Sequence, residues 1–234
     1  MIRGSCAAGN ETAGWAVYAS MNRCAATNRL AATFAAIGLR RWGTFAAFLA
    51  AMLLAGCGAG GPKFQSSDIT GSSFGRDFSL RDANGAMRSL ADFRGKAVVI
   101  FFGYTQCPDV CPTTLAALAE SMKALGPDAD RVQVLFVTVD PERDTPDLLR
   151  QYVPSFDPRF LGLYGDADAT ARTAKEFKVI YQKVPGTTPG SYTMDHSAGS
   201  YIFDPAGRLR LFVANGQGAD VFTHDLRALL HTGS

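Results

Sequence analysis

The chain has 234 residues, with 23 Lys and Arg against 21 Asp and Glu, three His and five Cys. An apolar share of 47% excludes an intrinsically disordered chain, and a net charge of +2 offers no electrostatic basis for binding nucleic acid. The length fits one domain or at most two small ones. Five cysteines is an awkward number for an exported protein, because an odd count leaves one of them unpaired.

The first 56 residues differ in composition from the rest of the chain. They contain five Arg, no Lys and a single acid, and Arg40 and Arg41 precede the uncharged apolar run 45–54. A positive region followed by a short apolar run and small residues is typical of a secretory signal peptide. The run is too short to cross a hydrocarbon core of about 30 Å as an uncleaved anchor. Leu54-Ala-Gly-Cys57 resembles the lipobox of bacterial lipoproteins, which implies lipid attachment to the Cys57 sulfur.

These features divide the chain into three parts. We expect residues 1–56 to be a lipoprotein-type leader, so that its cleavage removes Cys6 and Cys24 from the mature protein. Residues 57–73 are rich in Gly, Ser and Gln and are expected to be a flexible, lipid-anchored tether. Residues 74–234 are expected to form one globular domain with an ample core.

The expected domain begins with a hairpin pattern and two buried strands. Residues 78–81 alternate apolar and polar side chains, and Asn84-Gly85 is a strong signal for a two-residue hairpin turn, with Leu90 on the return arm. The runs 97–102 and 132–139 are mostly β-branched or aromatic, which is typical of strands buried on both faces.

The remaining elements alternate between helices and short strands. Pro112 suits the first position of a helix, where its missing N–H costs nothing. A short strand is expected at 160–164 and a second hairpin over 200–213. Helices are expected from apolar periodicity and capping residues at 112–125, 145–152, 169–177 and 220–230. This order predicts an α/β fold in which helices flank a central mixed β-sheet.

Cys107 and Cys111 lie between the first expected buried strand and the helix that follows it. Open α/β sheets place their chemistry at the carboxyl ends of strands. Amide groups at a helix N-terminus stabilise thiolates, which makes the sulfurs better nucleophiles and better metal ligands. The polar and proline-rich neighbours argue against two cysteines that merely fill the core. Two such thiols can form a disulfide, bind a metal, or do each in turn.

Only one of the three histidines lies in a setting that favours a ligand. His224 falls on the expected last helix and His231 near the C-terminus, where structural or surface roles are simpler. His196 lies in a polar stretch just before a strand, and Asp195 beside it could orient the ring, as carboxylates do for metal-ligating histidines. Two thiolates with one imidazole suit copper or zinc equally. From these residues alone, His196 is a ligand or an ordinary polar side chain.

Three segments, in the same order, resemble the Sco/SenC family of copper-binding, thioredoxin-like assembly proteins for cytochrome c oxidase. The first segment, 95–113, contains both cysteines, the second is 137–146, and the third, 195–197, contains His196. The likeness as a whole covers about residues 74–231. The resemblance implies a thioredoxin-like fold and a copper site formed by Cys107, Cys111 and His196, for Cu(I) and, with an added ligand, Cu(II). Asp140 matches a family acid on a loop near the copper, and Asp195 and Asp140 are expected to support the ligands.

Four further residues near these motifs have simpler interpretations. Arg143, Asp144 and Thr145 are expected only to begin a helix and to hydrogen bond within their loop. Tyr104 lies close to the thiols in sequence and is expected at most to shield or tune them.

The resemblance also implies a biological role. The implied role is a copper metallochaperone that delivers copper to the binuclear centre of cytochrome c oxidase subunit II. An upstream periplasmic copper donor is a compatible partner. The implied location is the periplasmic side of a bacterial envelope, held to the membrane by the lipid on Cys57. The alternative is a membrane-tethered thiol–disulfide oxidoreductase that reduces the cysteines of that centre, which leaves enzymatic activity open. Thioredoxin-like oxidoreductases have a Cys-x-x-Cys pair and a Pro just before the strand that faces the active site. The Cys-x3-Cys spacing of this chain and the lack of Pro in 195–199 therefore weaken this alternative. A thiol peroxidase fits less well, because Thr105-Gln-Cys107 has the wrong spacing.

Overall fold

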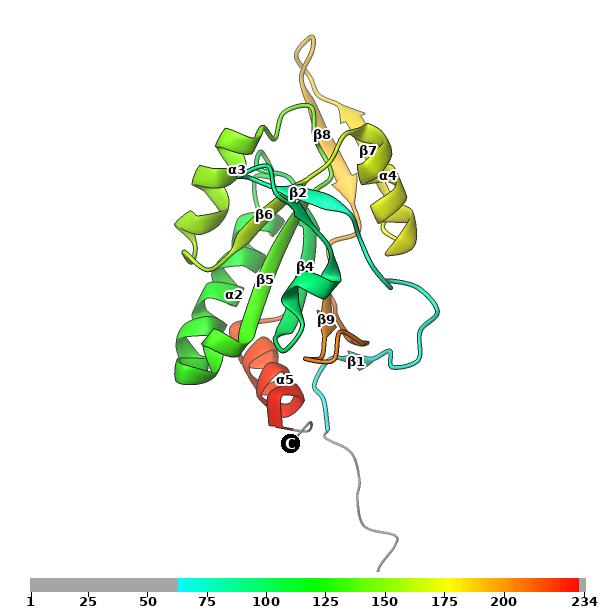
Figure 1. The fold of residues 1–234 in the computed structure, drawn as a ribbon. Coiled ribbons are helices and arrows are strands. Elements are labelled where there is room, and N and C mark those ends of the chain that lie inside the picture. Colours follow the sequence, from blue (N-terminus) through cyan, green and yellow to red (C-terminus); the bar gives the residue numbers. More distant parts are fainter. Residues whose placement is uncertain (1–62, 232–234) are drawn as a thin grey trace, which may run out of the picture. The chain divides into compact units, whose positions relative to one another are not determined.

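An eight-stranded sheet organises residues 63–231, which are the residues that the computed structural model describes (Figure 1). The strand order is β1-β10-β9-β4-β5-β6-β2-β3. The strands of this sheet are β1 (Ser67–Asp68), β2 (Leu80–Asp82), β3 (Met87–Arg88), β4 (Ala97–Gly103), β5 (Val132–Thr138), β6 (Leu161–Tyr164), β9 (Ser200–Phe203) and β10 (Leu209–Val213). The expected leader and the expected lipid site, Cys57, lie outside the described residues.

The sheet is mixed, as the order of elements predicts. β4 runs parallel to β5 and antiparallel to β9, and β5 runs parallel to β6. All seven residues of β4 are buried, because the strand is central and covered on both faces. The expected N-terminal hairpin forms from β2 and β3, although Leu90 lies in a 3-10 turn, η1 (Leu90–Phe93), rather than on the return arm.

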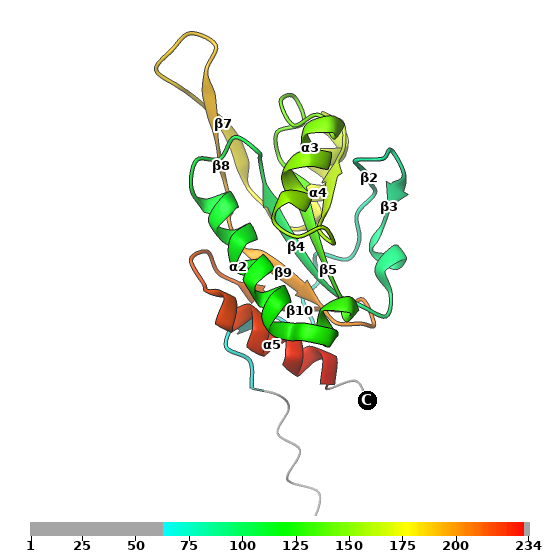
Figure 2. The ribbon, with the colours of Figure 1, turned by 90° about the vertical axis from the view of Figure 1, so that its left-hand side faces the viewer.

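Helices cover both faces of this sheet. Figure 2 shows α2 and α5 side by side on one face, where the two helices pack against each other. On the other face, Phe177 follows α4 and packs against the rings of Phe102 and Tyr201. No helix within residues 63–231 is both long and apolar enough to cross a membrane. The helices are α2 (Val110–Leu125), α3 (Pro146–Tyr152), α4 (Ala167–Glu176) and α5 (Ala219–His231), with short 3-10 helices η2 (Gly126–Arg131) and η3 (Val153–Ser155).

The structure differs from the sequence expectations at three further places. First, α2 begins at Val110, so Pro112 is its third residue rather than its first. This costs no hydrogen bond, because the N–H groups of the first helical turn have no partner within the helix. Second, the polar stretch that carries His196 belongs to a separate hairpin of β7 (Tyr181–Pro185) and β8 (Tyr192–His196). Most of its side chains are exposed or half-exposed, so it lacks the apolar alternation that marks a strand.

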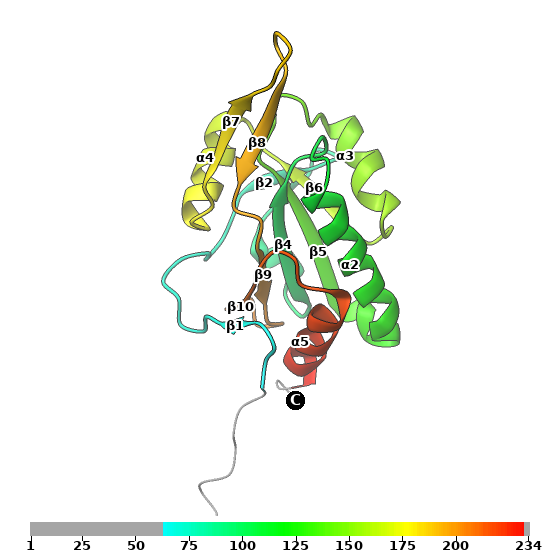
Figure 3. The same cartoon turned by 180° about the vertical axis from the view of Figure 1, so that it is seen from behind.

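Third, part of the expected tether is bound to the domain. Ser67 pairs with Phe212 of β10, and the backbone N–H groups of Gln65 and Ser66 donate to the carboxylate of Asp225 at 2.8 and 2.9 Å. Asp225 is fully buried on α5. The sequence near residue 65 gives no periodic signal because the paired strand is two residues long. The domain therefore begins before Phe74, and in Figures 1 and 3 this segment lies at the end of the domain opposite the β7–β8 hairpin.

Candidate metal centre

The two cysteines lie at the junction of β4 and α2, as expected, but in different surroundings. Cys111 is the second residue of α2 and is fully buried, whereas Cys107 lies on the preceding loop and is half-buried. The backbone N–H of Cys111 lies 3.4 Å from the Cys107 sulfur. The first turn of the helix therefore turns an amide toward Cys107.

Burial determines the protonation of the inner thiol. It raises the pKa of Cys111, and the neighbouring Cys107 adds to the rise. The sequence expectation of a stabilised thiolate is not met at Cys111, since loss of solvation outweighs the hydrogen bond from the Tyr104 backbone that favours the ionised sulfur. A metal ion that binds there must displace the proton.

Gly103 at the end of β4 makes room for the inner sulfur. A Cβ added to Gly103 would lie 2.9 Å from Cys111 Sγ and 2.8 Å from Cε2 of Phe136. Any larger residue would push the strand end and the sulfur apart. A glycine within a strand is a signal of close approach by other atoms, and Gly103 could have been used to find this contact from the sequence.

His196 completes the cluster from the other side. It is the last residue of β8, and its Nε2 lies 3.7 Å from Cys111 Sγ. Its Nδ1 lies 3.1 Å from the carbonyl oxygen of Ser197, and a proton on Nδ1 leaves the Nε2 lone pair free. Burial lowers the pKa of His196, which favours the neutral ring that metals bind. The expected orienting role of Asp195 is not what the structure shows, because its side chain is exposed and the Ser197 carbonyl contacts the ring instead.

The three side chains converge at one point. The Sγ atoms of Cys107 and Cys111 and a ring nitrogen of His196 all lie within 4.8 Å of one another. Bond lengths of about 2.3 Å to sulfur and 2.0 Å to nitrogen place S and N about 3.7 Å apart around a trigonal ion. That separation matches the Cys111–His196 distance. Within residues 63–231 this is the one group of three or more His, Cys, Asp or Glu side chains that fits a metal ion.

A loop after β5 holds the cysteine loop in place. Asp144 is buried and accepts hydrogen bonds from the backbone N–H and the hydroxyl of Thr105, the latter at 2.5 Å, and from the hydroxyl of Thr138 at 2.5 Å. Burial raises the pKa of Asp144, although these hydrogen bonds oppose the rise. The same loop contains Thr145, whose hydroxyl caps α3 by accepting from the N–H of Leu148, as the sequence predicts.

The same loop also contacts the histidine hairpin, through Asp140 and Arg143. Asp140 is buried, pairs with the Arg143 guanidinium at 2.5 Å and accepts from the Tyr192 hydroxyl at 2.9 Å. Asp140 thus reaches the site through Tyr192 of β8 rather than by touching a sulfur. The ring of Tyr104 packs edge-on against the His196 ring, with centroids 5.9 Å apart, so this residue lies beside the cluster.

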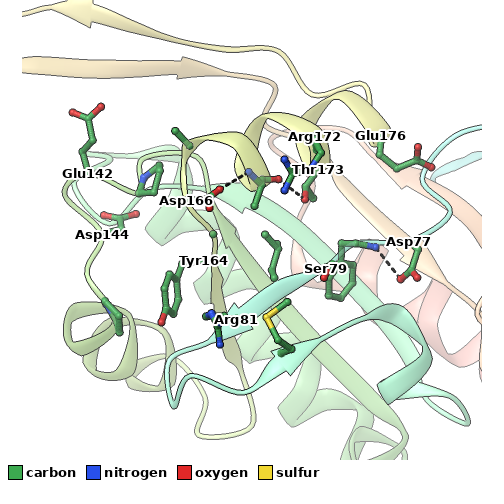
Figure 4. Close-up of a pocket in the computed structure, with 18 of the residues that line it drawn as sticks. Asp77, Ser79, Arg81, Glu142, Asp144, Tyr164, Asp166, Arg172, Thr173 and Glu176 are labelled. Atoms are coloured by element: carbon green, nitrogen blue, oxygen red, sulfur yellow. Dashed lines mark hydrogen bonds between the residues drawn. The ribbon is translucent and has the colours of Figure 1, made fainter.

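A cavity of about 1090 Å³ lies beside this loop, lined by β2, residues 141–142 and 144–146, and α4 (Figure 4). Asp144 lines it, but none of the three clustered side chains does. The other two histidines also lie elsewhere: His224 and His231 are on α5, where they contact Asp225 and Asp128.

Comparisons with known proteins agree with this geometry. "Protein SCO2 homolog, mitochondrial" of Bos taurus is 40% identical over 153 residues, which cover 64% of this chain. The match covers 58% of the bovine protein, so the chain spans less than two thirds of that relative's length. The structure of Bradyrhizobium japonicum ScoI with copper bound is 42% identical, with a TM-score of 0.61, and the match covers 68% of this chain and 100% of that one. The structure of yeast Sco1 with copper bound is 32% identical, with a TM-score of 0.62, over 70% of this chain and 90% of that one.

A sequence model described as SCO1/SenC matches residues 66–231, which is most of the chain. The mixed sheet flanked by helices is the thioredoxin-like fold of the similar solved structures. The chain therefore belongs to the SCO1/SenC family.

Proposed function

We propose that this protein is a copper metallochaperone whose ligands are Cys107, Cys111 and His196. The observation that carries the proposal is the convergence of two sulfurs and one ring nitrogen within 4.8 Å. Soft thiolates favour Cu(I), and one imidazole completes a three-coordinate site. Two similar proteins have structures with copper bound, at 42% and 32% identity, which supports copper over zinc.

The surroundings of the ligands suit a site that must release its ion. Cys107 is on a loop and half-exposed, and His196 is at the end of a hairpin outside the main sheet. A structural zinc site would have four protein ligands. The described residues offer three Cys or His ligands in the cluster, so the site keeps an open side for transfer.

The proposed destination of the copper is the binuclear centre of cytochrome c oxidase subunit II. This assignment follows from membership of the family. We place the domain on the periplasmic side of a bacterial membrane, held by residues 57–64 after cleavage of a leader 1–56 and lipidation of Cys57. An upstream periplasmic copper donor would supply the ion.

The alternative function is thiol–disulfide exchange with the cysteines of the same oxidase subunit. The closeness of the sulfurs and the exposure of Cys107 favour it. In this reaction the Cys107 and Cys111 thiols reduce a disulfide of the partner, form a disulfide with each other, and leave two thiols on the partner. The two functions use the same sulfurs and differ in their need for His196.

Copper titration of the domain from residue 58 separates these functions. We expect one Cu(I) per chain under anaerobic conditions, with sulfur and nitrogen ligands by X-ray absorption. Cys107→Ser should abolish tight binding, and His196→Ala should weaken it strongly while leaving two sulfur ligands. His224→Ala is the matched control, because its ring contacts Asp225 far from the sulfurs. If His196→Ala binds copper as the wild type does while the thiols reduce disulfides catalytically, the oxidoreductase is the function.

A further inference from the structure

Arg143 contacts both halves of the proposed metal site. Its guanidinium donates to the Gln106 side chain at 3.1 Å, next to Cys107, and to the carbonyl of Tyr192 on β8 at 2.9 Å. It is also paired with the buried carboxylate of Asp140. One side chain therefore joins the loop that carries Cys107, the loop after β5 and the hairpin that carries His196.

Arg143 and Asp140 both contact the Tyr192 side chain. The Arg143 guanidinium carbon lies 3.6 Å from the centroid of the Tyr192 ring, and the hydroxyl of that ring donates to Asp140 at 2.9 Å. Burial and this hydrogen bond raise the pKa of Tyr192 to about 12, which keeps the hydroxyl protonated as the donor. Asp140, Arg143 and Tyr192 thus form a closed set of contacts, which we call the hairpin latch.

The latch acts on the same face of β8 as the ligand. Side chains two residues apart point to the same side of a strand, so Tyr192, Met194 and His196 share one face. Met194 is buried, and its backbone hydrogen bonds to the Tyr104 side chain. The β7–β8 hairpin pairs with no strand of the main sheet, so these side-chain contacts supply what sheet hydrogen bonds would otherwise provide.

We propose that Arg143 is a positioning residue that holds the β7–β8 hairpin so that His196 Nε2 faces the two sulfurs. The inference rests on the proposed copper function and identifies the residue that fixes its third ligand. Arg143 contacts none of the three ligands. It reaches His196 through Tyr192 and through the ring of Tyr104, whose centroid lies 5.7 Å from the guanidinium carbon, and it reaches the Cys107 loop only through Gln106. Lys183 of β7 adds a second link to the same loop by pairing with Glu142 at 2.5 Å, but both side chains are exposed and such pairs contribute little.

A double-mutant cycle tests the proposal. Arg143→Met should weaken Cu(I) affinity by about 10- to 100-fold, the usual effect of losing a residue that orients a metal ligand. The loss cannot exceed that of His196→Ala if Arg143 acts through His196. In the His196→Ala background, Arg143→Met should therefore change the affinity less than about twofold. Tyr192→Phe, which removes only the hydroxyl contact to Asp140, is a milder second variant should Arg143→Met fold poorly.

The matched control is Arg88→Met. Arg88 pairs through Nε with the buried carboxylate of Asp82 at 2.8 Å, the same chemistry as Arg143 with Asp140, but on the edge strand β3. This control should change copper affinity in neither background. An equal effect of Arg88→Met and Arg143→Met on affinity, or an undiminished effect of Arg143→Met without His196, overturns the positioning role.

A metal-free measurement keeps this inference separate from the copper function. In the free domain, Arg143→Met should speed amide exchange at residues 192–197 and remove the proton NMR contact between the rings of Tyr104 and His196. The amides of β4 should keep their protection. Unchanged exchange in the hairpin overturns the proposal even if copper binds as expected. Failure of the wild type to bind copper instead overturns the function, and the exchange result then still decides the positioning role.

Discussion

Replacing Gly103 with Ala tests how closely the end of β4 controls the position of the Cys111 sulfur. The new Cβ would lie 2.9 Å from Cys111 Sγ and 2.8 Å from Cε2 of Phe136. Ordinary contact between such atoms begins at about 3.4 Å, so each neighbour must move by about 0.5 Å. Phe136 and Cys111 are both fully buried, so neither neighbour can move freely and part of the displacement falls on the sulfur.

The expected effect has two parts. Overpacking of this kind lowers the free energy of unfolding by about 1–3 kcal/mol. In the metal-free protein the Cys111 side chain can turn away from the new methyl group. A bound ion removes that freedom, because the Cys111 sulfur and His196 must both contact the ion. We therefore expect Cu(I) affinity to fall about tenfold, which corresponds to about 1.4 kcal/mol.

Urea unfolding measures the first part, and competition with a Cu(I) chelator measures the second. Gly162→Ala is the matched control, because Gly162 is also a buried strand glycine and an added Cβ there would meet Leu149 and Val153 at 3.2 Å, far from any thiol. It should lower stability without changing copper affinity. A Gly103→Ala protein that binds Cu(I) within twofold of the wild type would refute the reasoning.

Two further predictions concern pH. Burial opposes ionisation of Asp225, but hydrogen bonds from Gln65 and Ser66 outweigh it and lower the pKa of this carboxyl. The ionised form therefore stabilises the fold at pH values above the unfolded-state pKa of about 3.9. That stability is lost as the pH falls through the lower pKa of the folded state. Asp225→Asn should therefore cost about 1–3 kcal/mol in urea unfolding at pH 7 and less at pH 3, with faster amide exchange at Gln65; an equal cost at both pH values would contradict this. Since burial raises the pKa of Cys111, copper must displace its proton, and Cu(I) affinity should rise at least about tenfold per unit between about pH 6 and pH 8. A flat profile in chelator competition would show that the thiol is already ionised.

Local patterns predicted most of the elements that carry the cysteines. The run 97–102 became β4 with one added residue, and the helix after it, α2, begins two residues earlier than expected. A continuous apolar run and a helical stripe are properties of neighbouring residues, so they are visible without the fold. For the same reason the sequence located Cys107 and Cys111 between a strand and a helix.

The relation of His196 to those cysteines was not visible in the residues alone. The ring lies 3.7 Å from a sulfur 85 residues earlier in the chain, and the resemblance to a family, rather than any local pattern, marked it as the third candidate ligand. The hairpin that carries it is only partly buried, so its strands leave a weak signal. Arg143 was expected only to hydrogen bond within its loop, yet it joins that loop to the hairpin through Tyr192, 49 residues away.

The sequence by itself determined the type of fold, the position of the thiol pair and a short list of ligand candidates. The tertiary structure decided which thiol is buried, which glycine makes room for it, and which carbonyl contacts the histidine ring. It also moved residues 65–68 from the tether into the domain. The physical reason is that hydrophobic periodicity records burial along one element, whereas these features depend on hydrogen bonds and contacts between elements that only sheet order and packing bring together.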